Sequence, residues 1–241
     1  MSLNRLLKNA DSSFCSPRTR GYGELGMTKN RELDGAAEAA PMVDLPKLIA
    51  KFRAVNNRES DVAFFHTHVP WVAPDAYLNI IFKPAAGEVL SDVGAKIRMP
   101  APVLELLARH NGAKLLSGSL SLYGVVRHGQ LLNRSDPFSL PPFNIEFENQ
   151  SWPPPDRDRF LKIGGYGFDG SGVCIDRHNL HIGVFRRGGS DPYCSWPSLD
   201  VWLNSEIKRL SELFDPSGKR LVEGSQTLPS PTTDVPGIRP S

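Results

Sequence analysis

The stretch FLKIGGYGFDGSGVCIDRHNLHIGVF, residues 160–185, decides how the centre of this chain folds. Gly165, Gly167 and Gly170 spell G-x-G-x-x-G, the spacing of a dinucleotide-binding loop. Such a loop needs a helix after its last glycine, because the helix N-terminus holds the pyrophosphate. The residues that follow instead show apolar side chains at period two, at Val173 and Ile175 and then at Leu180, Ile182 and Val184. We therefore predict three antiparallel strands here, and no nucleotide site.

The composition of the 241-residue chain is ordinary for a globular protein, with 40% hydrophobic and 22% charged residues. The formal net charge of +2 gives no electrostatic argument for nucleic acid or for an anionic membrane. No apolar run approaches the ~20 residues of a membrane span, and the N-terminus lacks the apolar segment of a secretory signal. Three cysteines, an odd number, predict a cytoplasmic protein without a disulfide framework.

The two ends of the chain differ from its middle. Residues 1–41 are irregular and carry charges of both signs, and residues 216–241 are rich in proline and small polar residues, so we predict disordered tails. Between them, residues 42–215 carry helix and strand periodicities. Their order predicts the α+β class: a single domain in which helices pack against a mostly antiparallel β-sheet.

Individual elements follow from the same periodicities. Helices are predicted at 44–55, 87–97, 100–110 and 198–214, and the third of them stops at Asn111-Gly112. Phe143, Ile145 and Phe147 alternate with polar residues, which predicts a strand over 143–148. The other predicted strands lie at 62–69, 77–82, 120–126 and within 160–185.

Several residues could carry chemistry. His66 and His68 share a face of a predicted strand at a spacing that metals can use, but no third ligand is evident nearby. Cysteine catalysis at Cys174 needs a base and an electropositive setting that the sequence does not show. A second possible zinc set matches no common spacing: Cys174, His178, His181 and Cys194. We therefore predict no metal, no cofactor and no enzyme activity, with a metal- or cysteine-dependent hydrolase as an alternative.

A set of motifs resembles the SUKH superfamily, which includes yeast cell-wall regulators and bacterial toxin-immunity proteins. The proline-led helix that ends in His-Asn-Gly at 110–112, with Leu-Ser-Leu-Tyr-Gly at 120–124, is similar to one family signature. Residues 160–172 look like its glycine-rich hairpin, and Ser-Leu-Asp-Val-Trp-Leu at 198–203 looks like its closing helix. The resemblance covers about residues 42–214.

The resemblance implies a compact α+β domain that binds a protein without catalysis. It implies a cytoplasmic toxin-immunity protein that neutralises a cognate toxin by direct binding, with no nucleic-acid or membrane partner. The alternative within the family is a regulatory or scaffold domain with an endogenous partner. Exposed aromatic residues and arginines most often carry interface energy, so candidate contacts lie at the predicted loop tips: Trp152, Tyr166, Phe168, Asp169, Arg186 and Arg187.

Overall fold

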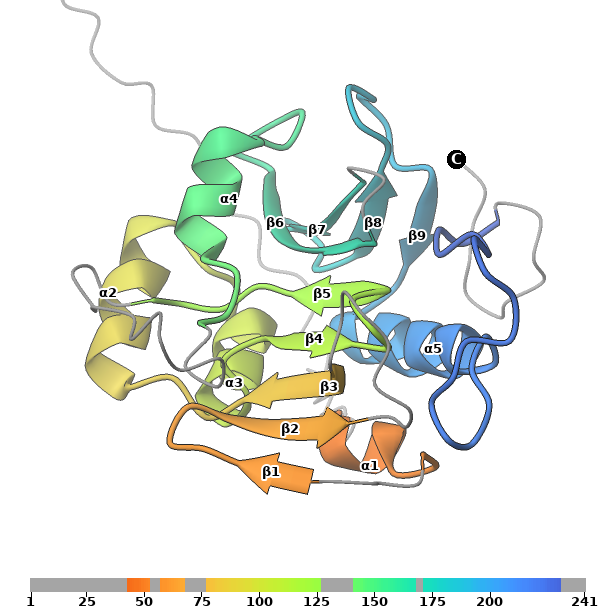
Figure 1. Ribbon diagram of the computed structural model, residues 1–241. Helices are drawn as coiled ribbons and strands as arrows, with labels where there is room; N and C mark the ends of the chain where they lie inside the picture. Colours follow the sequence, from red (N-terminus) through yellow and green to blue (C-terminus); the bar gives the residue numbers. More distant parts are fainter. Residues whose placement is uncertain (1–42, 53–56, 68–76, 127–140, 168–170, 231–241) are drawn as a thin grey trace, which may run out of the picture. The chain divides into compact units, whose positions relative to one another are not determined.

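Nine antiparallel strands form one sheet in the part of the chain that the structure describes, and each strand pairs with the next along the sequence (Figure 1). The computed structural model describes residues 43–52, 57–67, 77–126, 141–167 and 171–230. All of them belong to the unit Pro41–Ser241. The strands are β1 (Asn57–Glu59), β2 (Ala63–Thr67), β3 (Tyr77–Phe82), β4 (Ala113–Leu115), β5 (Leu120–Leu122), β6 (Phe160–Tyr166), β7 (Gly172–Asp176), β8 (Ile182–Phe185) and β9 (Cys194–Trp196).

The described residues also form five helices: α1 (Leu45–Ile49), α2 (Gly87–Lys96), α3 (Ala101–Arg109), α4 (Ile145–Ser151) and α5 (Leu199–Ser211). Figure 1 shows α1, α3 and α5 behind the central strands, on the same face of the sheet. The predicted α+β class, with helices against an antiparallel sheet, is therefore confirmed. None of these helices combines the length and the apolar composition that crossing a bilayer requires.

The sheet has a covered face and a second face of different chemistry. Strand residues that point toward α3 and α5 belong to one large apolar core, which includes Leu115, Leu120, Leu122, Ile163, Val173, Ile175 and Val184. The residues between them point the other way, because side chains alternate along a strand. On the central strands these are polar: Lys114, Ser121 and Lys162.

The glycines of residues 160–185 allow strands β5, β6 and β7 to lie close together. A strand follows these glycines, as predicted. A Cβ on Gly164 would lie 2.4 Å from the Ser121 carbonyl oxygen of β5, and one on Gly165 would lie 2.9 Å from the Ser171 oxygen. Gly167, at the turn, has φ +45°, a conformation that favours glycine. Gly170 lies outside the described residues. Gly164 and Gly165 thus serve strand packing and Gly167 a turn, and the next described element is strand β7.

The corner after α3 explains why Asn-Gly and Tyr-Gly occur together in this sequence. The chain leaves α3 through Gly112 at φ +86°, as the predicted helix stop requires. The Asn111 side chain then pairs with Val125: its Oδ1 accepts from the Val125 amide at 2.7 Å, and its Nδ2 donates to the Val125 carbonyl at 2.9 Å. A Cβ on Gly124 would lie 2.2 Å from the Asn111 carbonyl oxygen. This contact admits only glycine at position 124.

The strand predicted at 143–148 is wrong, because these residues begin helix α4. The side chain of Asn144 accepts hydrogen bonds from the amides of Glu146 and Phe147, and two acidic residues lie in the first turn. Both features stabilise a helix N-terminus. Phe143 and Phe147 are exposed, so their alternation does not mark a buried strand face. The short strands β1, β4 and β9 were not predicted, and α1 ends at Ile49 rather than near residue 55.

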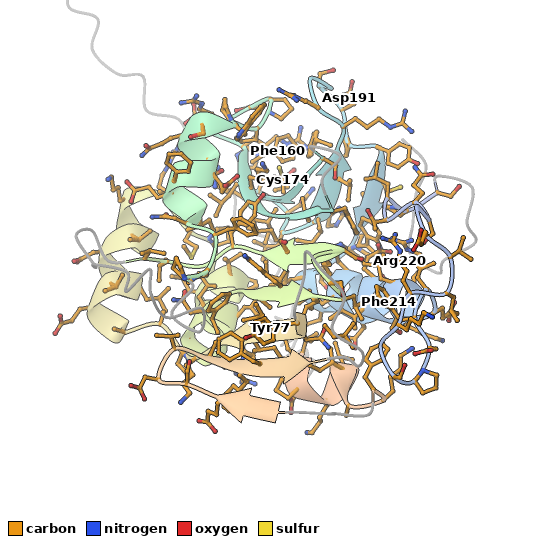
Figure 2. All side chains as sticks on the ribbon, in the orientation of Figure 1. Tyr77, Phe160, Cys174, Asp191, Phe214 and Arg220 are labelled. Carbon is orange, nitrogen blue, oxygen red and sulfur yellow. The ribbon has the colours of Figure 1, made fainter. Side chains whose placement is uncertain are left out.

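The domain extends beyond the predicted boundary at residue 215. Residues 216–230, assigned to a disordered tail from their composition, contact the rest of the domain. Phe214 and Arg220 form a backbone bridge and lie close together in Figure 2. The Thr227 carbonyl accepts from Arg209 at 2.6 Å, and the Pro229 carbonyl accepts from the Tyr193 hydroxyl at 2.7 Å. The predicted N-terminal tail, residues 1–41, and residues 231–241 of the predicted C-terminal tail lie outside the described residues.

Candidate functional site

A groove lies on the face of the sheet opposite α3 and α5. Its floor consists of Lys114 from β4, Ser121 from β5 and Lys162 from β6, which are the polar positions of strands whose alternate residues enter the core. Phe143, Glu148 and Trp152 line it from the α4 segment, and Arg187 lines it from the connection after β8. The cavity has a volume of about 510 Å³. We refer to this surface as the open-face groove.

Helix α4 is fixed beside the groove by one asparagine. The Asn149 Oδ1 accepts from the backbone amide of Lys162 at 2.9 Å, and its Nδ2 donates to the Lys162 carbonyl at 2.8 Å. Strand β5 ends before it reaches this part of β6, so the Asn149 amide takes the place of a neighbouring strand. The same side chain also donates to the Ile145 carbonyl within α4. One residue therefore sets the distance between the helix and the groove floor.

A second cavity, of about 310 Å³, continues the groove past β7 and β8. Trp152, Lys162 and Arg187 line both cavities, so the two are adjacent. An apolar cluster of Phe160, Cys174 and Phe185 lies at this end, and the rings of Phe160 and Phe185 meet edge to face with centroids 4.9 Å apart. Figure 2 shows Phe160 and Cys174 over β6 and β7. The groove thus runs from a polar floor toward an apolar end.

The one carboxylate that lines the groove, among the described residues, contacts its most buried cation. Lys162 is 8% exposed, and its Nζ lies 3.7 Å from Glu148 Oε2 and 5.5 Å from the centre of the Tyr123 ring. Burial, the charge of Glu148 and a hydrogen bond to Glu148 all raise the pKa of the Tyr123 hydroxyl well above its usual value. Tyr123 is therefore a neutral hydrogen-bond donor at physiological pH.

The remaining cations of the groove lie over aromatic rings. Lys114 Nζ is 4.5 Å from the centre of the Phe143 ring, and the Arg187 guanidinium is 4.3 Å from that of Trp152. Arg186, at the apolar end, lies 4.2 Å from the Tyr193 ring. Cation–π contacts of this kind restrict long side chains that would otherwise be mobile. The groove therefore presents positive charge at defined positions.

The structure brings some of the predicted contact residues together and corrects one. Trp152 is 50% exposed, and with Arg187 it forms a wall of the groove; Arg186 is exposed and lines the adjacent cavity. Tyr166 is only 1% exposed, and its hydroxyl accepts a hydrogen bond from Trp202 Nε1 of α5 at 2.9 Å. The expectation that Tyr166 is an exposed contact is therefore wrong. Phe168 and Asp169 lie outside the described residues.

Of the residues of the hydrolase alternative, the structure describes the side chain of Cys174. Burial raises the pKa of the Cys174 thiol to about 12, so it is protonated at neutral pH. Cys174 lies on the open face of the sheet and Cys194 in the core behind it, so a joint zinc site is not formed. No group of three metal-ligating side chains occurs among the described residues. The His66 side chain and all of His68 lie outside them.

Several groove residues were not predicted from the sequence: Lys114, Tyr123, Phe143, Glu148 and Lys162. The signal for two of them was present, since Lys114 and Lys162 each interrupt an apolar run at a strand position between core residues. Alternation reveals the face on which a residue lies, but not which strands are neighbours. That these residues lie together could therefore be known only from the order of the strands in the sheet.

The chain was compared with protein-family models, with curated proteins and with solved structures, and none of the three comparisons found a match.

Proposed function

We propose that this chain is a non-catalytic protein-binding domain of the SUKH type, and that it acts as an immunity protein that binds and neutralises a cognate toxin. The observation that carries the proposal is the open-face groove. It combines a half-exposed tryptophan, exposed arginines and a polar floor on a rigid sheet. Tryptophan, tyrosine and arginine are the residues that most often dominate binding energy at protein interfaces.

The chemistry of the groove supports binding rather than bond cleavage. Among its described lining residues, the thiol of Cys174 is protonated and the hydroxyl of Tyr123 is neutral, and the one carboxylate contacts Lys162. A nucleophilic mechanism needs a base within hydrogen-bond reach of the nucleophile. The groove offers hydrogen-bond donors, cations and apolar surface, which are the components of a recognition site.

The order of the family-like motifs supplies further support. The proline-led helix, the Asn-Gly corner, the glycine hairpin and the closing helix belong to one sheet-and-helix unit. The Asn111 to Val125 pairing joins two of these motifs directly. These motifs contact one another in the folded domain. A set of motifs in mutual contact is a more specific resemblance to the family than the same short matches taken separately.

Co-purification tests this function. The tagged full-length chain is expressed in its native host, and proteins that copurify with it are identified, expressed and measured for direct binding. The expected result is a partner that arrests growth when expressed alone and is tolerated when this chain is coexpressed. Trp152→Ala on the groove should weaken both binding and protection, whereas Lys208→Ala, at an exposed position of α5, should change neither.

Other outcomes separate the alternatives. A specific partner that is harmless to the host would contradict the immunity role and favour the regulatory or scaffold role. Recovery of no specific partner by the folded chain would overturn protein binding as the function. Partner binding that Trp152→Ala leaves intact would place the interface elsewhere.

A further inference from the structure

We propose that the open-face groove binds an acidic, extended segment of the partner protein, with a carboxylate at Arg187. This inference rests on the proposed protein-binding function and deepens it by specifying the partner's chemistry. It depends on three features of the described residues: the charge of the groove, the way its cations are held, and its length.

The charge of the groove differs from that of the whole chain. The two adjoining cavities are lined by four cationic side chains: Lys114, Lys162, Arg186 and Arg187. Among the described lining residues, the one carboxylate is Glu148. The chain as a whole has a formal net charge of only +2. Positive charge is therefore concentrated in the lining of this groove relative to the protein as a whole. Complementary charge steers association and excludes partners of the same sign, so an acidic segment fits this groove.

The cations are held in place before any partner binds. The Arg187 guanidinium lies over Trp152, and Lys114 lies over Phe143. A guanidinium held near a ring still has N–H groups that can donate in pairs to a carboxylate. Because these side chains are already ordered, a carboxylate that binds them incurs less conformational entropy cost.

The two adjoining cavities suit an extended segment rather than a single small anion. They share Trp152, Lys162 and Arg187, and together they lead from β4 and β5 to the connection after β8. The far end is apolar, with Phe185 and Cys174. A matching segment therefore carries its acidic residues over the polar floor and an apolar residue at the far end.

The same features disfavour single-stranded nucleic acid, which also binds basic grooves with aromatic residues. Nucleic-acid recognition on such surfaces depends on bases stacking on aromatic faces that are open. Here the rings of Trp152, Phe143 and Tyr193 each already face a cation of this chain. A base that stacks on the cation-facing side of these rings would have to displace the cation, whereas a carboxylate meets it directly.

Peptide selection tests the proposal. Phage-displayed random dodecapeptides are selected on the immobilised full-length chain, and enriched peptides are synthesised with a fluorophore for anisotropy titrations. We expect enrichment of sequences with several Asp or Glu residues and an apolar residue at one end. Arg187→Ala should weaken their binding about tenfold. The matched control Arg109→Ala, at an exposed position of α3 on the opposite face of the sheet, should leave it unchanged. Circular dichroism confirms that each variant is folded.

Three outcomes would overturn the proposal. The first is that no peptide is enriched, and the second is that the enriched peptides have no excess of acidic residues. The third is that Arg187→Ala leaves the affinity for the enriched peptides unchanged. A labelled twelve-nucleotide oligothymidine that binds more tightly than the peptides, and loses affinity in Arg187→Ala, would assign the groove to nucleic acid instead. These failures are distinguishable from failure of the proposed function. If a partner captured from the host binds with an affinity that Arg187→Ala does not change, the proposed protein-binding function stands and only the acidic-segment proposal is overturned.

Discussion

At the scale of single residues, the structure buries two polar side chains whose burial the sequence did not reveal. Tyr166 and Asp176 both lie in or beside the glycine hairpin, and both are nearly inaccessible to solvent. Each is satisfied by a partner that is distant in sequence: Tyr166 by Trp202 of α5, and Asp176 by Arg159 before β6, at 2.8 Å. Buried polar groups without partners are costly, so these pairs constrain the fold.

Replacement of Tyr166 by Phe tests whether this residue is structural. The change removes the acceptor of the Trp202 Nε1 hydrogen bond and leaves a buried N–H unpaired, so the free energy of unfolding should fall by about 1–2 kcal/mol. Urea titration monitored by tryptophan fluorescence measures the loss. Binding of a captured partner to folded Tyr166→Phe should be unchanged; weaker binding at unchanged stability would restore Tyr166 as a contact residue.

Asp176 predicts a specific pH dependence. Burial of the carboxyl opposes ionisation, but the hydrogen bonds from the His178 amide and from Arg159, together with the charge of Arg159, outweigh it and lower the pKa below 3.8. A carboxyl with a lower pKa in the folded state stabilises the fold above its unfolded pKa, and this contribution is lost as pH falls through the folded pKa. Asp176→Asn should therefore be less stable than wild type by about 1–2 kcal/mol at pH 7.

The difference should narrow as pH falls below about 4, because the carboxyl of the unfolded chain becomes protonated there while the folded carboxyl, whose pKa is lower, stays charged to a lower pH. Urea midpoints of both proteins from pH 7 to pH 3 measure it. A difference that stays constant over this range would show that the Asp176 charge does not contribute.

At the scale of secondary-structure elements, close backbone contacts join helices to strands. The α3 corner approaches the end of β5 so closely that position 124 has no room for a side chain. The amide of Asn149 similarly fixes α4 to β6. These contacts position the groove walls relative to its floor. A substitution that disrupts either contact should therefore also change the geometry of the groove.

Gly124→Ala tests the α3 corner. The new Cβ would lie 2.2 Å from the Asn111 carbonyl oxygen, a backbone atom that cannot move without displacing α3, so unfolding free energy should fall by about 3 kcal/mol or more. Gly87→Ala is the matched control, because no atom lies within 4 Å of its Cβ position and it begins helix α2. The control should be as stable as wild type or up to about 1 kcal/mol more stable. Similar melting temperatures for the two variants would contradict this account.

At the scale of the whole molecule, the described C-terminal segment closes a buried ionic network. Glu206 of α5 is fully buried, and Arg209 pairs with it at 2.6 Å while also donating to the Thr227 carbonyl. The hydrogen bond with Glu206 raises the pKa of Arg209 despite burial of the guanidinium, which stays charged. A buried ion pair needs all of its hydrogen bonds to be tolerated, so residues near 227 belong to the folded domain.

Truncation tests this role of the segment. A chain that ends at residue 215 loses the Thr227 and Pro229 acceptors and the packing of Leu228, so its unfolding free energy should fall by about 2 kcal/mol or more. A chain that ends at residue 230 keeps these contacts and is the matched control. Chemical denaturation of both compares them; equal stability would return residues 216–230 to the status of a dispensable tail.

Much of the fold follows from local sequence, because local patterns specify local structure. Period-two apolar residues after Gly172 require strands, and helices α3 and α5 follow from apolar stripes with clear ends at Gly112 and Ser198. The exception is α4, where the alternation of Phe143, Ile145 and Phe147 suggested a strand. There the Asn144 cap and the acidic first turn decided the structure, and both were visible in the sequence.

The groove itself depends on tertiary structure. Alternation assigned Lys114 and Lys162 to one face of their strands, but only the pairing of β4, β5 and β6 made these residues neighbours. Tyr166 resembled an exposed aromatic beside a turn until α5 covered it and supplied a hydrogen-bond donor. By itself the sequence thus determined the α+β class and the glycine hairpin, which arise from interactions a few residues apart. Only the tertiary structure decided which polar side chains meet on the open face, because strand order and helix placement are long-range properties.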